Sequence, residues 1–233
     1  MTSFDALGVS PDLVAVLRKQ GIEEPFPIQE MTIPDALAGR DVCGKAKTGS
    51  GKTLAFGLPI LQRVAKAEPK RPRAIALVPT RELCLQVHDA LVELAEANDR
   101  TVLAVYGGAK MDHQIKALQK GVDLVVATPG RMIDLIERKA VSVADLEHVV
   151  IDEADRMADM GFLPQVEWIL RQVENGHQTL LFSATLDGVV DTLIQRYQHD
   201  PAMHEVESSQ VTVEGMEHRF LPVWQTGPLV FDI

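Results

Sequence analysis

Short apolar runs alternate with longer helix-like segments along most of the chain. The runs are rich in Val, Ile and Leu and lack polar alternation, which is typical of strands covered on both faces. They predict strands over 41–44, 74–78, 102–106, 124–127, 148–151 and 179–182. The segments between them predict helices near 51–66, 81–97, 111–119, 130–138, 163–173 and 188–197.

This alternation predicts an α/β fold with a mostly parallel sheet and helices on both faces. Ahead of the first strand, Ser10 as N-cap, Pro11 in the first turn and Gly21 at the exit predict a short helix. In such sheets ligands bind beyond the carboxyl ends of the strands. We therefore expect the residues that carry chemistry to follow strands directly.

Composition and charge narrow the class of protein. The 233 residues are 46% hydrophobic and 24% charged, which fits one α/β domain with a tail and excludes a mostly disordered chain. The 23 basic and 33 acidic side chains give a net charge of −10. This excludes a uniformly basic nucleic-acid-binding surface but not a local basic groove. A basic, proline-containing loop spans 68–73, and either a solvated connection or an RNA contact is open for it.

The surroundings of the cysteines and the lengths of the apolar runs indicate the cellular compartment in which the protein works. Cys43 and Cys84 lie in apolar surroundings without partner spacing, so we expect buried free thiols in a reducing compartment. The histidines lack the paired spacing of a zinc site. No signal peptide is visible, and no apolar run approaches the ~20 residues of a membrane-spanning helix. We expect a cytoplasmic protein without a membrane partner.

Residues 46–53 follow a predicted strand and open a predicted helix, as a phosphate-binding loop requires. Gly49 and Gly51 let backbone N–H groups approach phosphates, Lys52 neutralises the β- and γ-phosphates, and the Thr53 hydroxyl ligates Mg²⁺. The alternative is a glycine-rich turn with a solvated lysine. The predicted ATP-binding residues of this loop are Ala46, Lys47, Thr48, Gly49, Ser50, Gly51, Lys52 and Thr53; Ala46 stands where such loops usually have a glycine.

A second apolar strand, 148–151, runs directly into Asp152, Glu153, Ala154 and Asp155. Carboxylates at this place suit a second Mg²⁺-organising acid and a water-activating base. We expect Asp152 to hold the metal through its waters and Glu153 to orient or deprotonate the attacking water. The alternative is an acid-rich helix start, which the helix dipole favours.

Together these residues resemble the DEAD-box ATP-dependent RNA helicases, down to the tetrapeptide Asp-Glu-Ala-Asp at 152–155. The resemblance extends from Phe4 to about Val206 and includes several motifs in the family's order. It implies a RecA-like P-loop NTPase domain that binds ATP, Mg²⁺ and the backbone of single-stranded RNA without reading its sequence.

Residues 21–29 are similar to the family's adenine-recognising Q motif, and Phe4 matches its isolated upstream aromatic. A glutamine amide offers one donor and one acceptor, which match adenine N6 and N7. The resemblance therefore implies ATP-binding roles for Phe4, Pro25 and Gln29. Ile22 stands where the family commonly has an aromatic, so adenine stacking is expected to be weaker or supplied elsewhere. The alternative for Gln29 is a surface residue after a proline-rich turn.

Three further segments that follow strands resemble those with which the family grips RNA. Their hydroxyls, glycine N–H groups and arginines suit phosphate contacts without base reading. The implied RNA-binding residues are Pro79, Thr80, Arg81, Gly107, Gly108, Thr128, Pro129, Gly130 and Arg131. The alternative is that they form helix caps and turns, with exposed arginines.

Ser183 and Thr185 resemble the family's coupling motif, whose hydroxyls hydrogen-bond the acidic tetrapeptide, here through Asp155. This contact links the nucleotide state to the RNA grip in the family. Plain helix capping by Thr185 or Asp187 is the alternative.

The second half of the family's machinery is missing from this sequence. A second RecA-like domain there contributes arginines from a run His-Arg-x-Gly-Arg-x-x-Arg, which is absent here. We therefore expect the N-terminal part of a longer helicase, divided into a Q-motif region (1–40), a RecA-like ATP-binding domain (41–207) and a linker with the start of a second domain (208–233). Because an arginine finger is worth about 10³–10⁵ in rate, this chain alone should hydrolyse ATP slowly.

The sequence thus predicts the core of an ATP-dependent RNA helicase whose RNA-stimulated ATP hydrolysis drives local unwinding in the full-length protein. Two rival functions stay open. One is an ATP-dependent DNA helicase on the same fold, and the other is a nucleotide-sensing RNA-binding module without turnover.

Overall fold

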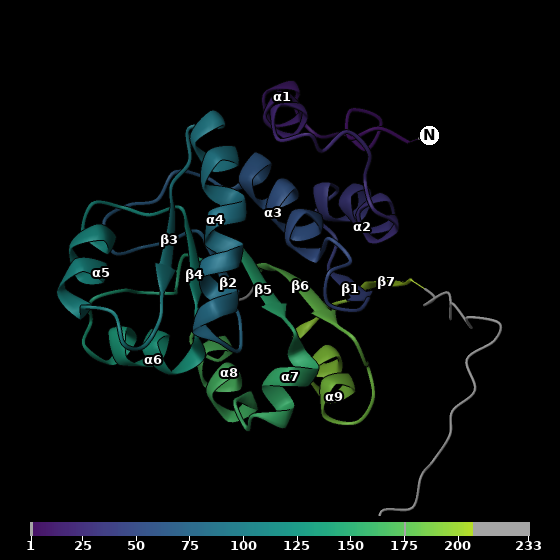
Figure 1. Ribbon diagram of the computed structural model, residues 1–233. Helices are drawn as coiled ribbons and strands as arrows, with labels where there is room; N and C mark the ends of the chain where they lie inside the picture. Colours follow the sequence, from purple (N-terminus) through teal and green to yellow (C-terminus); the bar gives the residue numbers. More distant parts are fainter. Residues whose placement is uncertain (1, 175, 207–233) are drawn as a thin grey trace, which may run out of the picture.

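The computed structural model describes residues 2–174 and 176–206, which form one sheet of seven parallel strands (Figure 1). The strand order is β3-β4-β2-β5-β6-β1-β7. The strands are β1 (Val42–Lys45), β2 (Ala74–Leu77), β3 (Val102–Val105), β4 (Leu124–Ala127), β5 (His148–Asp152), β6 (Gln178–Ser183) and β7 (Ala202–Glu205). Every neighbouring pair is parallel, which confirms the predicted sheet.

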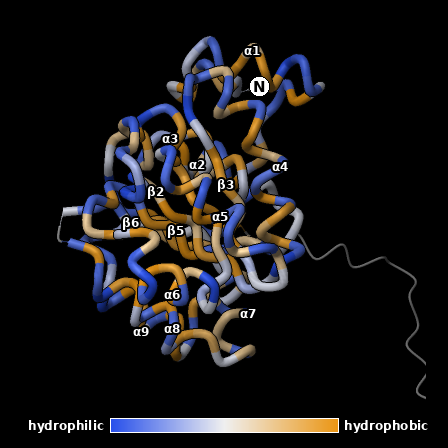
Figure 2. Tube along the Cα trace, turned by 90° about the vertical axis from the view of Figure 1, so that its left-hand side faces the viewer, coloured by the Kyte–Doolittle hydropathy of each residue, from blue (hydrophilic) through white to orange (hydrophobic). Residues whose placement is uncertain are grey.

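Nine helices in the described residues cover the two faces of this sheet. They are α1 (Pro11–Lys19), α2 (Pro27–Leu37), α3 (Lys52–Arg63), α4 (Arg81–Ala97), α5 (Met111–Leu118), α6 (Pro129–Glu137), α7 (Ala154–Asp159), α8 (Leu163–Leu170) and α9 (Val189–Tyr197). Helices α1 to α4 contribute to one hydrophobic core, and α5 to α9 contribute to the other. Figure 2 shows the apolar strands β2, β5 and β6 between α2 and α3 above and α6, α8 and α9 below.

The absence of polar alternation in the strands follows from this two-sided cover. In β2, Ala74 and Ala76 belong to the core beneath α3 and α4, whereas Ile75 and Leu77 belong to the core beneath α6 and α8. Successive side chains of a strand point to opposite faces, and here both faces are dry.

Three elements were not predicted from the pattern. Helix α2 begins at Pro27 and contains Pro34, and these prolines together suggest a turn rather than a helix. Helix α7 has only six residues. Strand β7 lies at the edge of the sheet, where Ala202 is buried but Met203 is 54% exposed, so it lacks the apolar run of a central strand.

Two smaller predictions concern the N-cap residue Ser10 and the linker after the last strand. Ser10 occupies the N-cap position of α1 as expected, but its side chain makes no capping hydrogen bond. The linker predicted over 208–233, with its strand starts near 211–213 and 220–221, lies outside the described residues.

Both cysteines are free and fully buried, as predicted. Burial raises the pKa of the Cys43 thiol to about 12 and that of the Cys84 thiol to about 11. Both side chains are therefore protonated at neutral pH and serve as small core residues. None of the helices in residues 2–174 and 176–206 combines the length and the apolar character needed to cross a bilayer.

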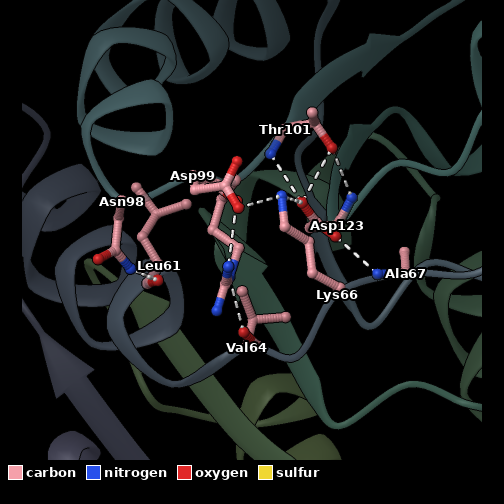
Figure 3. Close-up of polar contacts among 9 residues, drawn as sticks. Leu61, Val64, Lys66, Ala67, Asn98, Asp99, Thr101 and Asp123 are labelled. Carbon is pink, nitrogen blue, oxygen red and sulfur yellow. Dashed lines mark hydrogen bonds and ion pairs between the residues drawn. The ribbon is translucent and has the colours of Figure 1, made fainter.

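A buried carboxylate joins three loops at the amino ends of the strands (Figure 3). Asp123, 3% exposed, precedes β4. Its Oδ1 accepts a hydrogen bond from the Ala67 amide (2.7 Å), and its Oδ2 accepts from the amide (2.8 Å) and the hydroxyl (3.0 Å) of Thr101. Asp123 thereby fixes the entries to β2, β3 and β4 relative to one another.

We predict that Asp123→Ala lowers the free energy of unfolding by about 1–3 kcal/mol, because the part-buried backbone N–H groups of Ala67 and Thr101 lose their hydrogen-bond acceptor. Urea denaturation measures the change. Asp99→Asn is the control: the Asp99 side chain is 89% exposed and pairs with Lys66, and asparagine tolerates the left-handed backbone of this position (φ 51°), so the change should cost less than about 1 kcal/mol. Equal effects of the two substitutions would contradict this assignment.

Candidate functional site

The parallel sheet brings the predicted nucleotide-binding segments together at the carboxyl ends of its strands, which is called the carboxyl edge below. Strands β5, β6 and β1 are neighbours, and Lys45 at the end of β1 is aligned with Ser183 at the end of β6. The loop 46–53, the acidic tetrapeptide 152–155 and the segment 183–185 therefore leave the sheet side by side. The amide of Ala46 donates to the carbonyl of Ser183 (2.9 Å), which ties the loop to β6.

The loop 46–53 has the local structure of a phosphate-binding loop. Helix α3 begins at Lys52, directly after Gly51, whose φ of 88° lies in the left-handed region that favours glycine. A Cβ atom at Gly51 would also lie 2.5 Å from Gln29 Nε2. Ala46, which replaces the usual glycine, does not adopt a left-handed backbone, so alanine is tolerated there.

A buried ion pair lies at the centre of this edge. Lys52 Nζ lies 3.9 Å from Asp152 Oδ1, and the two side chains are only 6% and 3% exposed. Burial is the main cause that raises the pKa of Asp152 to about 6, with the neighbouring Glu153 charge adding to the rise and Lys52 opposing it. A cation supplied at Asp152 would relieve the cost of keeping this carboxylate ionised.

Glu153 is held in a strained conformation beside the loop. Its φ of 53° is left-handed, an arrangement that costs a non-glycine residue about 1–2 kcal/mol and that clusters at functional sites. Its Oε1 accepts a hydrogen bond from the Thr48 hydroxyl (3.1 Å), and its Oε2 accepts from Arg156 (3.1 Å). The carboxylate is thereby directed at the loop 46–53.

Gln29 approaches the same loop from α2. It is fully buried: its Oε1 accepts from the Phe26 amide (2.9 Å) and its Nε2 donates to the Gly51 carbonyl (2.8 Å). Both amide groups predicted to read adenine are thus bonded to the backbone. Phe26, 54% exposed, packs its ring against Gly51 and was not identified from the sequence. The available signal was an aromatic residue three positions before Gln29, within the motif 21–29.

The first two predicted RNA-binding segments meet beyond β2 and β3. The Arg81 guanidinium lies 5.0 Å from the centre of the Tyr106 ring, and it would lie 3.5 Å from a Cβ atom at Gly108. The Thr80 hydroxyl accepts from the Leu83 amide (3.2 Å) and caps α4, so the capping alternative is realised for this residue.

The third predicted RNA-binding segment, residues 128–131, lines a cavity of about 380 Å³ together with Gly107. Arg131 is held there by hydrogen bonds to the Ala109 carbonyl (3.2 Å) and to Gln114 Oε1 (3.0 Å). Phe162 and Gln165 contribute to the same cavity and were not predicted. Gln165 Oε1 is buried without a hydrogen-bond partner, which leaves an acceptor for a ligand. The remaining lining residues are Thr128, Pro129, Gly130 and Asp134.

Comparison with known proteins assigns the family. A model described as DEAD/DEAH box helicase matches residues 26–193, a stretch that contains every strand from β1 to β6. The chain belongs to the DEAD/DEAH box helicase family. The resemblance inferred from the motifs is thereby confirmed.

Curated relatives within this family include two bacterial proteins named DEAD-box ATP-dependent RNA helicase CshA. The one from Streptococcus pneumoniae is 42% identical over 94% of this chain and 42% of its own length, and the one from Bacillus subtilis is 39% identical over 95% and 44%. The chain therefore spans about two fifths of the length of these relatives.

Solved structures of the family share the RecA-like fold. A DEAD box protein from Methanococcus jannaschii is 35% identical with a TM-score of 0.83, over 89% of this chain and 56% of that one. A hypothetical ATP-dependent RNA helicase from Sulfolobus tokodaii is 34% identical with a TM-score of 0.77, over 84% and 56%.

For Phe4 and Ser183 the structure differs from the arrangement that the sequence predicted. Phe4 is 1% exposed and packs in the hydrophobic core, so its ring offers almost no surface to a ligand. The Ser183 hydroxyl does contact the tetrapeptide, but it accepts from the Asp155 amide (3.1 Å), while the Asp155 carboxylate accepts from the Ala184 amide (3.2 Å). Thr185 is exposed, and its side chain forms no hydrogen bond with the described residues.

The buried Asp152 predicts a pH-dependent stability. Because its pKa of about 6 exceeds its ordinary value of 3.8, the folded protein binds this proton more tightly than the unfolded chain, and stability falls as pH rises between these values. We expect Asp152→Asn to gain stability relative to the unmodified chain by on the order of 1–3 kcal/mol from pH 4 to pH 6 in urea denaturation. Asp12→Asn, at an exposed position, should not reproduce this slope; a pH-independent difference at Asp152 would refute the assignment.

Proposed function

We propose that the chain binds ATP with Mg²⁺ at the ends of β5, β6 and β1 and uses Asp152 and Glu153 in hydrolysis. The observation that carries this proposal is the convergence of Lys52, Thr48, Asp152 and Glu153 at one sheet edge, since these are the groups that phosphates, metal and water require. Lys52 would exchange its pairing with Asp152 for the β- and γ-phosphates. The remaining loop residues would surround the phosphates with backbone N–H groups.

The oxygen ligands at this edge fit Mg²⁺. Thr53 and Asp152 offer a hydroxyl and a carboxylate, and Mg²⁺ in such sites is completed by waters and phosphate oxygens rather than by a cage of protein ligands. When bound, the ion would neutralise charge on the phosphates. Glu153 would orient or deprotonate the attacking water, because its carboxylate already accepts a hydrogen bond from Thr48 of the loop.

Adenine recognition is proposed for Gln29, with Pro25 beside it. In binding, the Gln29 amide would exchange its bonds to Phe26 and Gly51 for adenine N6 and N7. The exposed Phe26 ring supplies the aromatic surface that Ile22 lacks. A contribution from Phe4 would be indirect, through packing of the core.

RNA binding is proposed for the edge formed beyond β2, β4 and β3. The residues involved would be Pro79, Thr80, Arg81, Gly107, Gly108, Thr128, Pro129, Gly130 and Arg131, which suit sugar-phosphate contacts without base reading. The buried Gln165 Oε1 can accept a hydrogen bond from a ribose hydroxyl. Coupling to the nucleotide would run through Ser183 and Asp155, whose contacts join β6 to α7.

For the whole protein we propose an ATP-dependent RNA helicase, as its curated relatives are named. A second RecA-like domain would supply the arginines absent here, so this chain alone should turn over slowly. A cytoplasmic location stays a prediction from the free cysteines.

Lys52→Ala tests the nucleotide site. We expect ATP affinity to fall about 100-fold, because the variant removes the buried ammonium that would pair with the phosphates. Isothermal titration with ATP and Mg²⁺ measures the loss. Lys116→Ala, which removes an exposed lysine of α5, should bind ATP normally. Retained ATP affinity in Lys52→Ala would rule out the proposed phosphate loop.

Glu153→Gln tests the catalytic assignment. We expect ATP affinity to change little and hydrolysis to fall about 100-fold, since a glutamine cannot act as the base. Phosphate release is measured at high protein concentration with single-stranded RNA and with DNA of equal length. Glu96→Gln, at an exposed position of α4, is the control.

Each alternative outcome of this comparison has a defined meaning. An unchanged rate in Glu153→Gln would disprove the catalytic role of Glu153. Equal stimulation by DNA would favour the DNA helicase. ATP binding without turnover under any condition would favour a nucleotide-sensing module for this chain.

A further inference from the structure

A second cavity, of about 640 Å³, lies away from the nucleotide site, near the amino ends of β2 and β5. Its lining comes from the basic loop 69–71, the end of α6, the segment 141–144 and Gln172 after α8. The volume falls within the ~300–1,000 Å³ of typical ligand pockets. Neither the proposed ATP-binding residues nor the proposed RNA-binding residues take part in it.

The basic loop that forms one wall of this cavity is held in place by hydrogen bonds. The Lys70 amide donates to the Leu118 carbonyl (2.7 Å), and the Lys70 carbonyl accepts from the Ser142 amide (2.8 Å). Arg71 Nη2 donates to Asp145 Oδ1 (2.8 Å). Because these bonds connect the basic loop to two other segments, the cavity is preformed and a ligand would not have to order it.

The cavity combines an apolar floor with a positively charged rim. Pro69, Ile136 and Ala144 provide the apolar surface of the floor, and Val141 and Val143 lie almost fully buried beneath it. Lys70 and Lys139 at the rim are exposed, and neither forms an ion pair with any described residue. No aromatic side chain lines the cavity, so it offers no stacking surface for nucleic-acid bases.

Both rim lysines hold an unusual backbone conformation. Lys70 has a φ of 64° and Lys139 a φ of 55°, in the left-handed region where glycine is the residue without strain. Of the five described non-glycine residues with positive φ, two therefore line this cavity and a third is Glu153. Lys139 lies in the turn that ends α6, where the Ala140 amide donates to the Leu135 carbonyl (3.0 Å), so the backbone holds its side chain at a fixed place on the rim.

We propose that this cavity docks an acidic peptide segment of a partner protein, in which apolar side chains are flanked by glutamate or aspartate. The apolar side chains would enter the floor, and the flanking carboxylates would pair with Lys70 and Lys139. Charge complementarity favours this occupant, because the rim is basic on a chain whose net charge is −10.

The test uses a fluorescein-labelled peptide of leucine and valine flanked by glutamates, with binding followed by fluorescence polarisation. We expect Lys70→Gly/Lys139→Gly to weaken binding about tenfold or more. Glycine suits both backbone conformations, so the variant should fold and should bind ATP like the unmodified chain. Lys19→Gln/Lys116→Gln makes the same change in net charge at exposed helix positions and should leave the peptide affinity unchanged.

A second variant, Ile136→Ser, tests the floor and should also weaken peptide binding. Unchanged affinity in the lysine double variant would overturn the proposal. So would displacement of the peptide by inorganic phosphate with no effect of Ile136→Ser, which would indicate an anion site only. Loss of single-stranded RNA affinity in the lysine double variant, without loss of peptide affinity, would instead make this loop an RNA contact.

Discussion

Parallel pairing of β5, β6 and β1 is the constraint on which the candidate site depends. Because the three strands run in the same direction and end at nearly the same level, the segments that follow them are brought together without any further element. Each strand is buried on both faces, so a slip of one residue would exchange its two sets of apolar side chains between the cores. The register that protects the core therefore also sets the distance between Lys52 and Asp152.

The chemistry at this edge is concentrated in groups that already have partners within the chain. Lys52 pairs with Asp152, Thr48 with Glu153, and Gln29 with the backbone of Gly51. A nucleotide would have to exchange these contacts rather than add to them. Its affinity would then be the difference between two sets of hydrogen bonds, which is the situation of every buried polar group that binds a ligand. The left-handed backbone of Glu153 indicates that folding energy holds this arrangement in place.

The segments at the carboxyl ends of the strands differ in physical character from those at the amino ends. At the carboxyl ends, loops carry glycines, hydroxyls and paired charges that a ligand can displace. At the amino ends, Asp123 fixes three loops with hydrogen bonds to the backbone, and the neighbouring basic cavity keeps its lysines exposed. These hydrogen bonds fix where β2, β3 and β4 begin, and the short strands in turn fix where the segments at their carboxyl ends begin.

The sequence by itself determined the strands β1 to β6, the strand-to-helix turn at 46–53 and the family, because buried runs and motif spacing are local properties of the chain. Tertiary structure decided the rest. Helix α2 forms despite Pro27 and Pro34, β7 pairs at the edge without an apolar run, and Phe4 is buried in the core. Exposure and hydrogen-bond partners depend on segments distant in sequence. Only packing could therefore place Phe26 beside Gly51 or leave Gln165 without a partner.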